Sequence, residues 1–209
     1  MSLEPLISLL EEPMKEVNKV IINKMGSNVP LIKEIASHLI SAGGKRMRPM
    51  LTISGALVAN ENELTEKVFA LAAAVEFIHS ATLLHDDVID ASKKRRGKDT
   101  INYIWGNELS VLVGDFLFAR SFELMVETDS LSILEKLSNA SVCITEGEIK
   151  QNTMIGNPDS SIEDYFEVIN GKTAKLFAVA AQTGCLVNRG KKKYCQALHD
   201  YGLAIGRAL

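Results

Sequence analysis

The sequence is poor in cysteine, proline and tryptophan, and it has little net charge. Its 209 residues include 3 cysteines, 5 prolines and 1 tryptophan, with a formal net charge of −3. An odd number of dispersed cysteines argues against a disulfide framework and favours free thiols in a reducing compartment, and no zinc-site spacing is present. A mildly acidic chain also argues against general nucleic-acid binding.

Targeting segments are missing as well. Residues 1–13 carry three glutamates and no basic region, unlike a secretory signal. Polar residues such as Glu76 and His79 interrupt the longer apolar segments, so none is expected to be long and apolar enough to cross a bilayer. These features predict a cytoplasmic protein without a transmembrane segment.

Helical periodicity dominates, and few stretches alternate with the period of two that strands show. From Thr65 to His85, apolar residues recur at steps of three and four in a segment rich in alanine, the strongest helix former. The same pattern predicts helices over 107–127, 131–153 and 161–186. We expect one all-α domain, residues 1–209, without a linker or repeat.

Glycine, proline and polar clusters mark the breaks between these helices. Gly43-Gly44 and Pro49 enclose a basic turn, and residues 91–106 are expected to form a charged loop. The other predicted breaks are Pro30, Asn60-Glu61-Asn62, Gly156-Asn157-Pro158-Asp159 and residues 189–193.

An acidic cluster, His85-Asp86-Asp87-Val88-Ile89-Asp90, closes one apolar helix. Asp86 and Asp90 are four residues apart, so they share a helix face on which their charges repel, and the helix dipole adds to the repulsion. Mg²⁺ would compensate them, because it prefers carboxylate oxygens and commonly bridges to phosphates. The alternative is that the aspartates pair with the basic residues 93–96.

Basic segments lie on both sides of this cluster in the chain. Gly43–Pro49 places three cations in a turn, where glycine permits close approach and arginine offers a planar fork for phosphate oxygens. Arg95-Arg96-Gly97 repeats this chemistry. His79, two helical turns before Asp86, can donate to phosphate, although a histidine on such a helix is more often a packing residue.

Gly171-Lys172-Thr173 is similar to the end of a nucleotide-binding P-loop. The glycine required five residues earlier is Phe166, and the flanks are helical, so the P-loop is rejected. Lys172 and Thr173 can still bind a diphosphate from a break in a helix. No Ser/His/Asp or Cys/His arrangement suggests a nucleophile.

In their order, these motifs resemble those of the trans-isoprenyl diphosphate synthases, the polyprenyl synthetase family. Gly43–Pro49 resembles the GGKRxRP element, and residues 83–97 resemble the first aspartate-rich motif with its adjoining arginines. Further resembling segments are Gly114-Asp115-Phe116-Leu117, Glu146-Gly147-Glu148 and Gly171-Lys172-Thr173-Ala174. The resemblance implies a bundle of antiparallel helices of the isoprenoid synthase type.

Diphosphate recognition is the role that the resemblance assigns to most of these residues. The residues implied to hold isopentenyl diphosphate are Lys45, Arg48, His79 and Arg96. The residues implied to contact an allylic prenyl diphosphate are Arg95, Lys172 and Thr173. The implied Mg²⁺ ligands are Asp86 and Asp90. The implied reaction is head-to-tail chain elongation, in which the allylic diphosphate ionises and isopentenyl diphosphate attacks the cation.

The resemblance also bears on the product. Five and four residues before Asp86 stand the small residues Ala81 and Thr82, which would leave a tunnel open for a long chain. Phe118 and Phe122 could form a deeper floor, although a core role is favoured. Residues 39–126 are most similar to family members that make octaprenyl (C40) diphosphate for ubiquinone. A homodimer is implied, with product release at a membrane surface.

The sequence departs from the family pattern near its end. The family carries a second aspartate-rich motif on a later helix, and residues 201–209 resemble the stretch that leads into it. No second DDxxD occurs in the chain. We therefore expect a C-terminally truncated part of the family fold, with little condensation by itself. It could be a fragment, a shortened gene product or a subunit completed by another chain.

Three hypotheses for function stay open at this point. The chain could be a prenyl-elongating enzyme, or a catalytically weak subunit that binds prenyl diphosphates or supports a partner. The third hypothesis is a terpene cyclase with a similar helical site. Gly43–Pro49 and His79 argue against the cyclase, because a cyclase uses no second diphosphate substrate.

Overall fold

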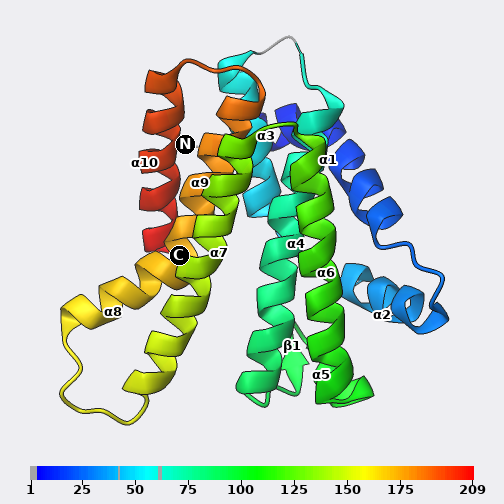
Figure 1. The fold of residues 1–209 in the computed structure, drawn as a ribbon, viewed down its shortest axis with the longest axis vertical. Helices are drawn as coiled ribbons and strands as arrows, with labels where there is room; N and C mark the ends of the chain where they lie inside the picture. Colours follow the sequence, from blue (N-terminus) through cyan, green and yellow to red (C-terminus); the bar gives the residue numbers. More distant parts are fainter. Residues whose placement is uncertain (1–3, 42, 61–62) are drawn as a thin grey trace.

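The computed structural model describes residues 4–41, 43–60 and 63–209, which are almost entirely helical (Figure 1). The first half contains α1 (Glu4–Lys24), α2 (Pro30–Ser41), α3 (Met47–Ala59), α4 (Glu66–Ile89), β1 (Lys94–Arg95) and β2 (Lys98–Asp99). The second half contains α5 (Ile101–Trp105), α6 (Asn107–Glu127), α7 (Leu131–Met154), α8 (Ile162–Ile169), the π-helix η1 (Asn170–Ala174), α9 (Lys175–Val187) and α10 (Lys192–Ala208). The predicted all-α fold is confirmed.

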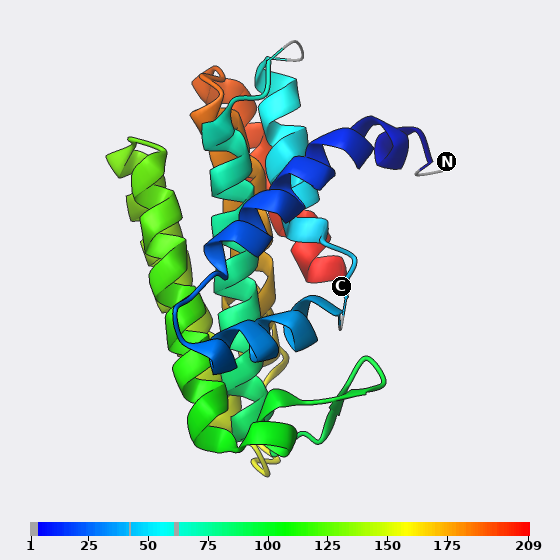
Figure 2. The ribbon, with the colours of Figure 1, turned by 90° about the vertical axis from the view of Figure 1, so that its right-hand side faces the viewer.

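Helix α4 forms the centre of the bundle. It packs against α6, α3, α1 and α9, and its alanines allow these neighbours to approach closely. Figure 2 shows α1 and α2 crossing the bundle on one side, while α6 and α7 stand along its edge. Because α4 is covered from several directions, the residues that it carries are held on a rigid support.

Helix α4 is more apolar than was predicted from the sequence. By length and composition it is the one helix among the described residues that could cross a membrane, which corrects the expectation that no segment would qualify. However, 67% of its most apolar window is buried within the bundle. Its hydrophobicity is explained by this packing, since a core helix buries apolar surface on every side.

Local structure differs from the predictions in three places. The basic turn predicted over Gly43–Pro49 ends at Arg46, because α3 begins at Met47. Residues 161–186, expected as one helix, form α8, η1 and α9 in succession. The expected loop 91–106 contains a two-stranded hairpin, with Lys94 paired to Asp99, followed by the short α5. Pro30 begins α2, where its missing N–H costs nothing. Of the predicted turn Asn60-Glu61-Asn62, the last two residues lie outside the described part of the chain.

Two of the cysteines meet in the structure. Cys185 on α9 and Cys195 on α10 are both buried, and their Sγ atoms lie 2.7 Å apart as free thiols. Burial raises the pKa of Cys185 to about 12, and the hydrogen bond with Cys195 acts in the same direction. The Cys185 thiol therefore remains protonated at neutral pH.

Candidate functional site

A cationic pocket forms where the turn before α3 meets α4 and the hairpin. It is lined by Gly44, Lys45, Arg46, Met47, Arg48, Glu76, His79, Arg96 and Phe177. The hairpin closes on the turn, because Nη1 of Arg96 donates to the carbonyl of Gly43. Gly44 leaves room for this contact, since a Cβ there would lie 2.5 Å from the same nitrogen. The pocket thus gathers Lys45, Arg48, His79 and Arg96, the four residues predicted to share one diphosphate.

Arg48 is a partly buried cation of this pocket. Its guanidinium stacks over the ring of Phe177, 4.3 Å from the centroid, and its Nε is buried without a partner among the described residues. Burial lowers the pKa of Arg48 to about 10, so it stays charged at neutral pH. A buried donor without a partner is costly, and an anionic ligand could satisfy it.

His79 is held as a neutral imidazole beside these arginines. Burial lowers its pKa to about 2, and the charges of Arg48 and Arg96 contribute. A neutral ring still donates one hydrogen bond, which suits a phosphate oxygen. His79 lines the same cavity as Asp87, whereas Asp86 lines a different one.

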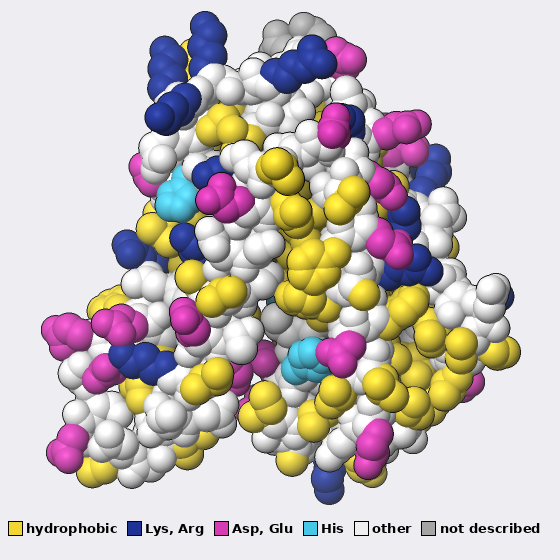
Figure 3. Space-filling model, viewed as in Figure 1, with side chains coloured by type: hydrophobic (Ala, Val, Ile, Leu, Met, Phe, Trp, Pro, Cys, Tyr) yellow, Lys and Arg dark blue, Asp and Glu magenta, His cyan; other side chains and the backbone are white. Residues whose placement is uncertain are grey.

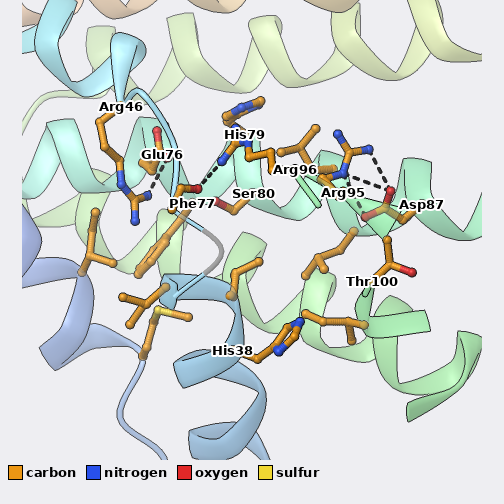
Figure 4. Close-up of a pocket in the computed structure, with 18 of the residues that line it drawn as sticks. His38, Arg46, Glu76, Phe77, His79, Ser80, Asp87, Arg95, Arg96 and Thr100 are labelled. Atoms are coloured by element: carbon orange, nitrogen blue, oxygen red, sulfur yellow. Dashed lines mark hydrogen bonds and ion pairs between the residues drawn. The ribbon is translucent and has the colours of Figure 1, made fainter. Parts of the chain in front are cut away.

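Two buried carboxylates of α4 pair with arginines from the neighbouring segments (Figure 4). Glu76 accepts from Nη1 of Arg46 at 2.6 Å, and both side chains are largely buried. Oδ1 of Asp87 accepts from Nε and Nη2 of Arg95, at 3.0 and 2.8 Å. The predicted alternative, in which aspartates pair with the following basic residues, therefore holds for Asp87. Arg95, predicted to bind the allylic diphosphate, already has a partner.

An acidic cleft lies between α4 and α7. Its lining residues are Thr82, His85, Asp86, Ile89, Ile144, Thr145, Glu148, Ile149, Asn152 and Thr153. Lys172 forms an ion pair with Oε2 of Glu148, and its Nζ lies 3.7 Å from Oδ2 of Asp86. Figure 3 shows a hollow between the two halves of the molecule on this face. One lysine thus serves two largely buried carboxylates.

Negative charge is in excess in the acidic cleft. Burial raises the pKa of Asp86 to about 6, with Glu148 and Asp90 adding to the rise and Lys172 opposing it. The described residues contain no group of three or more His, Cys, Asp or Glu side chains arranged to hold a metal by themselves. Mg²⁺ suits a site in which the carboxylates of Asp86 and Asp90 supply some of its ligands, and water and the phosphate oxygens of a bound ligand supply the others. The donor chemistry therefore fits.

The π-helix η1 brings Lys172 into this cleft. It lies against α7 at a backbone contact, since a Cβ on Gly147 would meet the Lys172 nitrogen at 2.7 Å. Helix α10 supports η1 through Nε of Arg207, which donates to Oδ1 of Asn170 at 2.6 Å. A short π-helix within an α-helix is frequent at functional sites. Thr173 lines a separate cleft between α7 and α8, together with Lys172.

No individual role was predicted from the sequence for Glu76, Arg46 or Glu148. Glu76 could have been found, because it stands alone among the apolar residues 68–78, and a charged residue in such a helix is rarely buried without a partner. Glu148 appeared only as part of a motif. Its pairing with Lys172 depends on the approach of two helices, which periodicity does not report.

Comparison with known proteins places these features in context. Residues 29–209 match the family described as polyprenyl synthetase. The octaprenyl diphosphate synthase of Haemophilus influenzae is 40% identical over 211 residues, covering 100% of this chain and 63% of that protein. The chain thus spans less than two thirds of that relative's length.

Solved structures agree with this match. A decaprenyl diphosphate synthase from Rhodobacter capsulatus superposes with a TM-score of 0.94 at 47% identity, covering 99% of this chain and 63% of that one. A polyprenyl synthase from Caulobacter crescentus, complexed with calcium and isoprenyl diphosphate, gives 0.94 at 49% identity, with coverage of 98% and 62%. The predicted resemblance is therefore confirmed.

Proposed function

The chain belongs to the polyprenyl synthetase family, and from this premise we propose that it serves head-to-tail condensation of isopentenyl diphosphate with an allylic prenyl diphosphate. One observation carries the proposal: α4 contributes to a cationic pocket and to a separate acidic cleft. Two diphosphate substrates require two sites, and these two differ in charge. A terpene cyclase would need only one of them.

Isopentenyl diphosphate would bind in the cationic pocket. Lys45, Arg48 and Arg96 would neutralise its charge, and His79 would add a neutral donor. Phosphate oxygens suit arginine particularly well, because the planar fork donates two hydrogen bonds at once. The partnerless Nε of Arg48 supports this assignment.

The allylic diphosphate would bind at the acidic cleft. Asp86 and Asp90 would hold Mg²⁺, which supplies positive charge for the departing diphosphate when it is bound. Lys172 would stabilise the same leaving group. The family resemblance adds Thr173 and Arg95 as contacts, although Thr173 lines a separate cleft and Arg95 is paired with Asp87. Family members depend on divalent metal ions, and calcium accompanies isoprenyl diphosphate in the Caulobacter structure.

No side chain has to act as a nucleophile in this reaction. As the allylic carbon–oxygen bond breaks, the electron pair leaves with the diphosphate. The double bond of isopentenyl diphosphate then attacks the allylic carbon. A proton is lost to the released diphosphate, which restores a double bond. The role of the protein is to position both substrates and to stabilise charge as it develops.

We propose a long product because the residues near the cleft are small, and C40 by preference because octaprenyl diphosphate synthases are among the similar proteins. Thr82 lines the cleft, and its hydroxyl is occupied by a hydrogen bond to the carbonyl of His79 at 2.8 Å. Ala81 is fully buried beside it. Phe118 and Phe122 contact each other edge to face on α6, with centroids 5.4 Å apart. A ubiquinone precursor of this length would be released at a membrane surface.

We also propose a cytoplasmic homodimer that uses the outer face of α6. This helix exposes Val111, Leu112, Phe122 and Val126. Figure 3 shows hydrophobic side chains gathered over it. Exposed apolar patches on a protein commonly mark interaction surfaces. Sedimentation equilibrium would test the dimer, and a Val126→Glu variant should be monomeric if this face is used.

The test of function is incubation with Mg²⁺, isopentenyl diphosphate and farnesyl diphosphate, followed by product analysis and calorimetry of each ligand. Elongated prenyl diphosphates would support the enzyme. Binding of both ligands without elongation would support the alternative, a catalytically weak diphosphate-binding subunit. Failure to bind either diphosphate would contradict the proposal.

A further inference from the structure

We infer that Glu76 is a positioning residue of the cationic pocket, which holds Arg46 and thereby sets the turn that carries Lys45 and the start of α3 that carries Arg48. The inference deepens the proposed function and rests on it, because it takes the pocket to be a diphosphate site. Glu76 would not touch the substrate. It would act through the conformation of its partner.

Glu76 is the single carboxylate among the residues that line this pocket. Only 7% of its surface is exposed. Arg46, Arg48 and Arg96 all act on it electrostatically, and they come from two separate segments: the turn with the first residues of α3, and the hairpin. Arg46 alone forms a direct ion pair with it. The carboxylate of Glu76 is therefore a buried anion close to all three arginines.

Arg46 has an unusual backbone conformation. Its φ is 48°, in the left-handed region, and it is the N-cap of α3 without a side-chain capping hydrogen bond. A residue other than glycine persists there only when its surroundings enforce it. The ion pair with Glu76 anchors the Arg46 side chain while the backbone holds this conformation. Lys45 precedes Arg46 directly and Arg48 follows two residues later, so the conformation of Arg46 directs both.

The charge of Glu76 makes the inference testable by sign. A carboxylate inside an anion site should repel the anion, so a purely electrostatic account predicts tighter binding when Glu76 is neutralised. A positioning account predicts weaker binding, because the turn loses the contact that orients its cations. The two accounts therefore disagree on direction.

The experiment is calorimetric titration of the chain with inorganic pyrophosphate in the presence of EDTA. Three variants are compared with the unmodified chain: Glu76→Gln, Arg46→Gln and the double variant. We expect Glu76→Gln to weaken binding about ten-fold. The double variant restores the original net charge, and we expect it to bind no more tightly than Glu76→Gln. Glu123→Gln, which breaks the surface pair with Arg120, is the matched control and should bind normally.

Each result decides the matter. Equal or tighter binding by Glu76→Gln, or normal binding by the double variant, would overturn the inference while leaving the proposed function intact. No binding by the unmodified chain would overturn the cationic site itself. Circular dichroism checks folding. If Glu76→Gln does not fold, the double variant, which removes both members of the Glu76–Arg46 ion pair, provides the decisive comparison.

Discussion

The cationic pocket and the acidic cleft share α4 but have opposite ratios of charge. In the pocket, Lys45 and three arginines surround one carboxylate, that of Glu76. In the cleft, the ammonium of Lys172 serves the carboxylates of Asp86 and Glu148, with Asp90 nearby. Each site is therefore left with an excess that its own protein partners do not balance. The excess is positive where a diphosphate would bind alone and negative where a metal ion would accompany it.

The ion pair between Asp87 of the same helix and Arg95 has a structural role. Asp87 follows Asp86 in the sequence and is buried. Its carboxylate accepts two hydrogen bonds from the guanidinium of Arg95. Such a pair fixes the hairpin to α4. Two adjacent aspartates thus differ because Asp87 has an arginine of its own, whereas Asp86 shares Lys172 with Glu148.

Substitution of these two aspartates should give the largest contrast. Asp87→Asn breaks a buried ion pair, and we expect it to lower the free energy of unfolding by about 3 kcal/mol. Asp86→Asn relieves repulsion, so without metal it should leave the stability unchanged or raise it. It should also abolish Mg²⁺-dependent binding of farnesyl diphosphate. Urea denaturation and calorimetry measure the two effects, and equal destabilisation by both variants would refute the distinction.

Removal of Lys172 should have the next largest effect. Lys172→Met leaves Glu148 and Asp86 without their cation, and we expect a loss of about 2 kcal/mol of stability in EDTA. Mg²⁺ should restore part of this loss, because it replaces the missing charge. Lys150→Met is the control: Lys150 pairs with Asp164 and Glu167 at the surface, and its removal should cost less stability than the removal of Lys172. A Lys172→Met loss that Mg²⁺ leaves unchanged would argue against a metal site.

The pH dependence of stability should show whether His79 is neutral in the cationic pocket. The pKa of His79 is about 2 in the folded protein and near 6.5 in the unfolded chain, so only the unfolded chain takes up a proton between these values. The contribution of His79 to stability is therefore fully present above pH 6.5 and is lost as the pH falls. Between pH 6.5 and 5, His79→Gln should lose about 1–2 kcal/mol less than the unmodified chain.

Chemical denaturation at each pH would measure this difference. His199→Gln, on α10 beside Asp200, serves as the control outside the pocket. If His79→Gln and His199→Gln have the same pH profile as the unmodified chain, then His79 is not held neutral by its surroundings.

Much of this arrangement could be predicted from the sequence. Apolar spacing located α4, α6 and α7 to within a few residues, and the ordered motifs identified the family. The pairing of Glu76 with Arg46 could not be predicted, because it depends on how a turn packs against a helix far from it in sequence. Periodicity also missed η1, since a π-helix shifts the hydrogen-bond pattern without a characteristic composition. The pairing of Arg95 with Asp87 likewise depends on the hairpin, which was predicted only as a loop.

The central claim is that the two sites differ in their need for metal. Calorimetry with inorganic pyrophosphate in EDTA tests it most directly, using the unmodified chain, Asp86→Asn and Arg48→Met. The account predicts equal binding by the first two proteins and a loss of binding in Arg48→Met. Binding that requires Mg²⁺, or that disappears in Asp86→Asn, would contradict it.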